Sequence, residues 1–138
     1  MSLLPYIYFN GRCEEALTFY ARCLGDEVKL LELHRFAGSP MAADAPEGWG
    51  DKVMHASLGR EGEPLLLASD GTPGRSGDAP RGFSLAFGAG TVEQAERVFA
   101  ALAEGGKVDM PIAQTFFAAR FGMLTDRYGI AWMVNCDA

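Results

Sequence analysis

Two apolar runs flank a short turn in the stretch Gln114-Thr-Phe-Phe-Ala-Ala-Arg-Phe-Gly-Met-Leu-Thr-Asp-Arg-Tyr-Gly-Ile-Ala-Trp-Met-Val-Asn135. The runs, residues 117–124 and 130–135, are rich in aromatic and branched side chains, which favour the pleated surface of a strand. Between them lies Asp126-Arg-Tyr-Gly129, whose glycine adopts a positive φ without a Cβ clash. This stretch therefore predicts a β-hairpin.

The first half of the chain predicts a strand, a helix and three further strands. The strands are expected at 3–9, 27–36, 52–59 and 64–69, and Gly25 is expected to end the helix. The helix has one apolar stripe with the spacing of an amphipathic helix. Its members are Ala16, Phe19, Tyr20, Cys23 and Leu24.

The second half repeats this order. Thr91-Val-Glu-Gln94 has the form of a capping box that opens a helix, and strands are expected at 82–87, 107–110, 117–124 and 130–135. Each residue of the second apolar stripe lies 79 residues after its counterpart in the first, as Ala95 does after Ala16. The other members are Val98, Phe99, Leu102 and Ala103. Matching order and spacing indicate an internal repeat.

The predicted fold class is α+β, with two βαβββ modules in a single domain spanning residues 1–138. Module 1 covers about 1–70 and module 2 about 82–138. A helix covers one face of each curled mixed sheet, so the two uncovered faces are expected to enclose a cleft. The long loop at 37–51 is a candidate ligand cover, and 70–81 is expected to be a linker.

Bulk composition excludes several function classes. The net charge of −6 and the pI near 4.8 argue against a nucleic-acid partner. No apolar run reaches the ~18 residues of a membrane helix, and no secretion signal is visible. Three cysteines without C-x-x-C spacing fit reduced thiols in the cytoplasm.

The stretch from Gln114 to Asn135 resembles the end of PhnB-like proteins of the glyoxalase/bleomycin-resistance/dioxygenase (vicinal oxygen chelate) superfamily. Three further segments carry the same resemblance: Leu4-Pro-Tyr-Ile-Tyr-Phe-Asn-Gly11, Glu14-Glu-Ala-Leu-Thr-Phe-Tyr20 and Val53-Met-His-Ala-Ser-Leu58. The resemblance implies the two-module fold and a small-molecule ligand. Together with exposed strand edges, it favours a homodimer.

Enzymes of this superfamily hold a divalent ion on the first and last strands of each module. At the matching positions this sequence has Pro5, Phe83 and Met133, with Asp70 as the one carboxylate near the fourth strand. Proline, phenylalanine and methionine side chains supply no hard donors, so we expect neither a metal nor another cofactor.

The two histidines leave alternatives open. Glu32 and His34 share a strand face and could bind a metal or move a proton, or they could simply form a solvated surface. His55 is either a hydrogen-bonded structural residue or a polar anchor for a ligand. Trp132 is expected in the core.

Three functions follow as hypotheses. The first is a metal-free small-molecule-binding protein, with a site formed by His55, Ser69, Gln114, Phe117, Met133 and Asn135. The second is an enzyme, metal-dependent or using a general base, of the lyase, isomerase or dioxygenase type. It would draw on Glu32, His34, His55, Asp70 or Asn135. The third, least favoured, is a demethylubiquinone methyltransferase, since no Gly-rich loop for a methyl donor is present.

Overall fold

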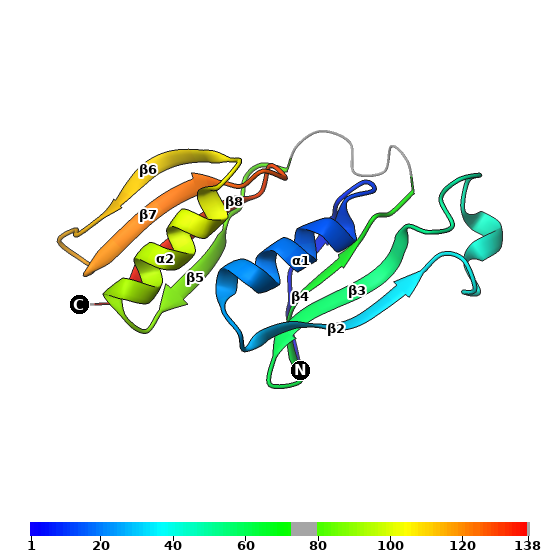
Figure 1. Cartoon of the computed structure of the whole chain (residues 1–138), viewed down its shortest axis with the longest axis horizontal. Coiled ribbons are helices and arrows are strands. Elements are labelled where there is room, and N and C mark those ends of the chain that lie inside the picture. Colours follow the sequence, from blue (N-terminus) through cyan, green and yellow to red (C-terminus); the bar gives the residue numbers. More distant parts are fainter. Residues whose placement is uncertain (73–79, 138) are drawn as a thin grey trace. The chain divides into compact units, whose positions relative to one another are not determined.

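The structure is a computed structural model that describes residues 1–72 and 80–137. Within this described part the chain has two α-helices, one short 3₁₀ turn and eight strands. They form two compact units, Met1–Gly77 and Asp78–Ala138, each with its own sheet (Figure 1). The two units are taken in turn.

The first unit is a four-stranded mixed sheet with one helix. Its strand order is β1-β4-β3-β2, in which β1 runs parallel to β4 and the other neighbours are antiparallel. The elements are β1 (Tyr6–Tyr8), α1 (Cys13–Leu24), β2 (Val28–Arg35), η1 (Ala42–Asp44), β3 (Val53–Arg60) and β4 (Glu63–Ser69).

Helix α1 lies along one face of this sheet (Figure 1). Its predicted apolar stripe is buried at Ala16, Phe19, Tyr20 and Cys23. The helix packs on apolar sheet residues that are also buried, and those on β3 and β4 lie two positions apart. These sheet residues are Ile7, Ala56, Leu58, Leu66 and Ala68.

The second unit repeats this architecture. Its strand order, β5-β8-β7-β6, is that of the first sheet, again with a parallel pair formed by the first and last strands. The elements are β5 (Leu85–Ala89), α2 (Val92–Ala103), β6 (Lys107–Ala113), β7 (Arg120–Thr125) and β8 (Ala131–Cys136). The predicted α+β fold of two βαβββ modules is confirmed, and the two helices begin 79 residues apart, at 13 and 92.

Helix α2 begins at the predicted capping residues. The Thr91 hydroxyl accepts from the Gln94 backbone N–H at 3.1 Å, and the Gln94 side chain accepts from the Gly90 N–H at 2.8 Å. Further along, Phe99 packs over Gly122, where an added Cβ would lie 2.7 Å from the ring. This glycine therefore lets the aromatic ring of the helix approach β7.

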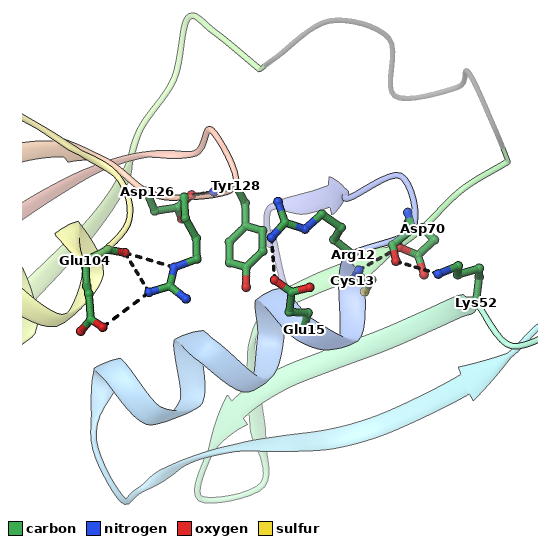
Figure 2. Close-up of polar contacts among 10 residues, drawn as sticks. Arg12, Cys13, Glu15, Lys52, Asp70, Glu104, Asp126 and Tyr128 are labelled. Carbon is green, nitrogen blue, oxygen red and sulfur yellow. Dashed lines mark hydrogen bonds and ion pairs between the residues drawn. The ribbon is translucent and has the colours of Figure 1, made fainter.

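The closing hairpin is confirmed, and Asp126 organises it (Figure 2). The buried carboxylate accepts from the backbone N–H groups of Tyr128 and Ile130 at 2.8 and 3.1 Å, and from Trp132 Nε1 at 2.9 Å. Gly129 has the expected positive φ, 85°. Trp132 is buried, as predicted.

Two predicted strands are longer than the observed ones. The strand expected at 117–124 begins only at Arg120, because the Thr115 hydroxyl accepts from the N–H groups of Phe117 and Ala118 and holds a turn there. The strand expected at 3–9 is reduced to β1, since Pro5 has no N–H and contributes only its carbonyl, to Leu67. Other boundaries differ by one to three residues.

The two expected loops have different outcomes. The loop at 37–51 is tied back to the unit, because Trp49 Nε1 donates to the Gly71 carbonyl at 2.7 Å and the Ala37 N–H to the Gly50 carbonyl at 2.8 Å. Most of the expected linker at 70–81 lies outside the described residues.

Truncation of Phe19 or Phe99 tests the repeated core. Both rings are buried, 3 % and 6 % exposed, so Phe19→Ala and Phe99→Ala should each lower the free energy of unfolding by roughly 3–5 kcal/mol in a denaturant titration. Phe116→Ala, at a fully exposed phenylalanine, is the control and should change it little. A negligible loss at either buried position would contradict the assignment of that stripe to the core.

Candidate functional site

The face of the first sheet turned away from α1 carries two tyrosines. Because Ile7 and Phe9 are buried with the helix side of the core, Tyr6 and Tyr8 project to the opposite side and are 41 % and 38 % exposed. Their ring centroids are 5.4 Å apart.

His55 on β3 lies between groups from two other strands. The Tyr6 hydroxyl is 2.9 Å from His55 Nδ1, and Glu32 Oε1 on β2 is 3.5 Å from His55 Nε2. We call Tyr6, His55 and Glu32 the His55 cluster. Since β1 and β2 are the two outer strands of the sheet, the cluster spans its whole width.

His34 lies beside this cluster, with its Nε2 3.6 Å from the other oxygen of Glu32. The rings of His34 and His55 are nearly parallel, at 16°, with centroids 6.5 Å apart. Both Nε2 atoms contact the carboxylate of Glu32, His34 at one oxygen and His55 at the other. Within the described residues, no three or more His, Cys, Asp or Glu side chains are grouped to hold a metal.

The phenol of Tyr6 stays protonated at neutral pH. Burial raises its pKa above the ordinary value, and the neighbouring Tyr8 and Cys13 raise it further, while a hydrogen bond with Ser69 acts the other way. Tyr6 therefore keeps its hydroxyl proton, and its role as donor to or acceptor from His55 Nδ1 is set by the imidazole tautomer.

Asp70, the carboxylate considered as a metal ligand, has a structural role instead. It is 1 % exposed. Its Oδ1 accepts from the N–H groups of Gly11 and Cys13 at 2.7 and 2.8 Å, and its Oδ2 from Val53 N–H at 2.8 Å. Figure 2 shows it beside Cys13 and Lys52 at the start of α1. Both oxygens are engaged, so the donor set at the family's metal positions does not fit a divalent ion.

The Cys13 thiol is held protonated in this environment. Burial, followed by the charges of Asp70 and Glu14, raises its pKa to about 12. Cys23 and Cys136 are also buried as free thiols. A protonated, buried thiol is a poor nucleophile, so Cys13 is a packing residue.

Ser69 and His55 belong to the first unit, but their side chains are engaged differently. Ser69 is buried, and its hydroxyl donates to the Val53 carbonyl at 3.3 Å and accepts from Gly71 N–H at 2.9 Å. His55 is half-buried and reaches the tyrosine across β4. A ligand role for Ser69 stays a prediction.

The other four predicted ligand residues belong to the second unit. Met133 and Asn135, both half-buried, alternate on β8 with buried Trp132 and Val134. Asn135 is paired with Phe121, whose ring lies 5.1 Å from that of Phe117.

Gln114, directly after β6, is exposed. Met133 pairs with Met123, which pairs in turn with Met110, so three methionines form a row across this face.

Sequence reasoning missed the role of Tyr6. The alternation of Tyr6 and Tyr8 along the strand was a signal, since it places both side chains on the same side of the sheet. It does not say which residue of another strand they contact. The partner follows from the strand order, because β4 inserts between β1 and β3 and allows the tyrosine to reach His55.

Comparison with known proteins identifies the family. Residues 2–134 match the model of the Glyoxalase/Bleomycin resistance protein/Dioxygenase superfamily. The chain belongs to this superfamily. It is 36 % identical to Protein YjdN of Escherichia coli (strain K12), over 98 % of this chain and 95 % of that protein.

Two solved structures have a similar fold. Protein PA1353 from Pseudomonas aeruginosa is 43 % identical, with a TM-score of 0.85 over 99 % of this chain and 98 % of that one. A PhnB protein from Bacillus cereus, described as a putative 3-demethylubiquinone-9 3-methyltransferase, has 24 % identity and a TM-score of 0.80, with 99 % of both chains covered. At that identity the second similarity shows the fold alone.

This superfamily member has no helix, in the part of the chain that the structure describes, of the length and apolarity that a bilayer crossing requires. Each of its sheets is mixed, with one parallel pair. A doubly wound parallel sheet, which commonly positions a nucleotide-type cofactor, is therefore not formed by the described strands.

Asp70→Asn tests the structural role of this carboxylate. The amide replaces one acceptor oxygen with an N–H₂ group and removes the charge, so at least one buried backbone N–H loses its partner. We expect the free energy of unfolding to fall by at least about 2 kcal/mol in denaturant titrations. Asp26→Asn, at an exposed carboxylate, is the matched control, and an equal effect of both variants would contradict the proposed role.

Proposed function

We propose that the protein binds a small molecule on the face of the first sheet turned away from α1, without a metal ion between protein and ligand. The observation that carries the proposal is the hydrogen bond between Tyr6 and His55, 2.9 Å long and on a partly exposed sheet face. A polar pair in such a position offers donors and acceptors to a ligand.

The surroundings of this pair support a ligand of mixed character. Leu65 is exposed and Leu67 half-buried, and both lie on the face of Tyr6, since Leu67 is its cross-strand partner. Binding sites for small molecules combine apolar area with a few polar groups that fix orientation. This face has both.

The second unit supplies a further apolar surface for the proposed function. Met133, Asn135 and Phe117 extend along one face of β8 and the turn before β7, with Gln114 at the end of β6. Methionines adapt their shape to varied partners. We also propose that these four residues and Ser69 contribute to ligand binding. The proposal includes a homodimer and a cytoplasmic location.

A general-base enzyme is the second candidate, favoured by one observation. Glu32 Oε1 lies 3.5 Å from His55 Nε2, the arrangement in which a carboxylate orients an imidazole. Chemical change of a bound compound, followed by chromatography or NMR and lost in His55→Ala, would select the enzyme over the binding protein.

Elemental analysis tests the metal-free part of the proposal. Protein purified without chelators should contain no stoichiometric zinc, nickel, manganese or iron, because backbone N–H groups engage Asp70 and the described residues hold no group of three or more His, Cys, Asp or Glu side chains suited to a metal. One equivalent of such a metal, absent from His55→Ala, would overturn the proposal.

A thermal-shift screen of metabolites and aromatic drugs tests the location of the site. Compounds that raise the melting temperature by binding the first sheet should bind His55→Ala at least tenfold more weakly, a loss of about 1.4 kcal/mol, the size of one or two hydrogen bonds, and compounds that bind the second unit's surface should lose affinity likewise in Asn135→Ala. His34→Ala is the control for loss of an imidazole. Unchanged affinity in both His55→Ala and Asn135→Ala would place the site elsewhere.

A further inference from the structure

We infer that Tyr6, His55 and Glu32 form a proton relay that ionises the hydroxyl group of a bound phenol or enol. The inference rests on the proposed function, since it assumes a ligand on this face of the first sheet. It adds the ligand's chemical class and a direction of proton movement.

The hydrogen-bond partners fix the direction of the relay. Glu32 Oε1 lies 3.5 Å from His55 Nε2 and favours the neutral tautomer with its proton on Nε2, so Nδ1 accepts from the Tyr6 hydroxyl at 2.9 Å. Tyr6 has that proton to donate, because burial and Tyr8 raise its pKa. A neutral imidazole that accepts at Nδ1 carries its own proton on Nε2. That proton faces Glu32 Oε1 at 3.5 Å. The relay therefore runs from the Tyr6 hydroxyl to the imidazole of His55, and the carboxylate of Glu32 lies at its inner end.

The outer end of the relay is open to a ligand. Tyr6 is 41 % exposed, and its oxygen keeps a lone pair after donating to His55. A ligand hydroxyl can donate to this lone pair. As its proton moves to Tyr6 Oη, the tyrosine proton moves to His55 Nδ1, leaving a ligand oxyanion and an imidazolium. No bond other than O–H and N–H bonds changes, and no other reactant is needed.

The charged products are both stabilised within the cluster. The oxyanion accepts a hydrogen bond from the newly formed Tyr6 hydroxyl, and Glu32 neutralises the imidazolium. Among the described residues, the ionisable groups in contact with His55 are Tyr6 from β1 and Glu32 and His34 from β2, and Tyr8 lies beside Tyr6. The carboxylate of Glu32, 3.5 Å from Nε2, therefore lies beside the imidazolium that the transfer forms.

The acidity of the ligand's hydroxyl group decides which class of compound the relay can ionise. An aliphatic alcohol is too weak an acid to give its proton to an imidazole, whose ordinary pKa is about 6.5. A carboxylic acid is already ionised at neutral pH and has no proton to give. Phenols with electron-withdrawing groups and enols of dicarbonyl compounds lie between these limits. Their flat frames also suit a face lined by Tyr8 and Leu67.

The experiment uses 4-nitrophenol, whose ionised form absorbs visible light whereas its neutral form does not. Mixed with the full chain below the pH at which free nitrophenol ionises, the bound compound should show about tenfold more phenolate than free nitrophenol at the same pH. His55→Gln still accepts from Tyr6 but cannot take a proton, so it should bind nitrophenol without the phenolate band. Tyr6→Phe should also lose the band, and Glu32→Gln should weaken it.

Control variants and separate readouts keep the outcomes distinct. His34→Gln leaves the contacts of Tyr6, His55 and Glu32 in place and should keep the band, and circular dichroism checks the fold of each variant. Nitrophenol that binds wild type but stays neutral, or that does not bind at all, overturns the relay. Either result leaves the proposed function standing if other compounds in the screen bind and depend on His55. A screen without any hit overturns the proposed function itself.

Discussion

One buried carboxylate, Asp70, joins three parts of the first unit that lie far apart in the sequence. It accepts from Gly11 and Cys13 at the start of α1 and from Val53 at the start of β3. The residue before the helix, Arg12, makes no side-chain cap, so Asp70 supplies from 57 residues away the acceptor that a local cap would give. This fixes where the helix begins, and thereby the position of β1 and its tyrosines. The His55 cluster depends on this placement, because Tyr6 lies only a few residues before the capped end.

The two units share a strand order and a helix position but present different chemistry on the sheet face away from the helix. In the first unit that face carries ionisable groups, Tyr6, Glu32, His34 and His55. In the second it carries a row of three methionines with Phe121 and Asn135. The buried helix side is similar in both, since α1 and α2 bury stripes at matching offsets. A repeat of this kind keeps the residues that pack and varies those that can meet a ligand.

Much of this could be predicted from sequence, and the rest could not for identifiable reasons. The apolar stripes, the Thr91 cap and the Asp126 turn are local patterns, and each was predicted from residues within a few positions of one another. The bond from Tyr6 to His55 crosses 49 residues and depends on β4 lying between their strands, which alternation does not encode.

The structural role of Asp70 was not predicted for the same reason, since its three donors come from other elements. At Phe117 a strand pattern was outweighed by the Thr115 hydroxyl, which holds a local turn.

The parallel pairing of first and last strands has a consequence for synthesis on the ribosome. Tyr6, Ile7 and Tyr8 leave the ribosome early, yet their partners are Leu67, Ala68 and Ser69. Until those residues emerge, the first strand has no neighbour in its sheet and α1 lacks its distant cap. The first unit is thus expected to assemble in one late step, when its final strand emerges. The second unit is expected to do the same, because its first strand, β5, pairs with its last strand, β8. A nascent chain that stalls before residue 70 would expose its aromatic N-terminal strand to chaperones and to other chains.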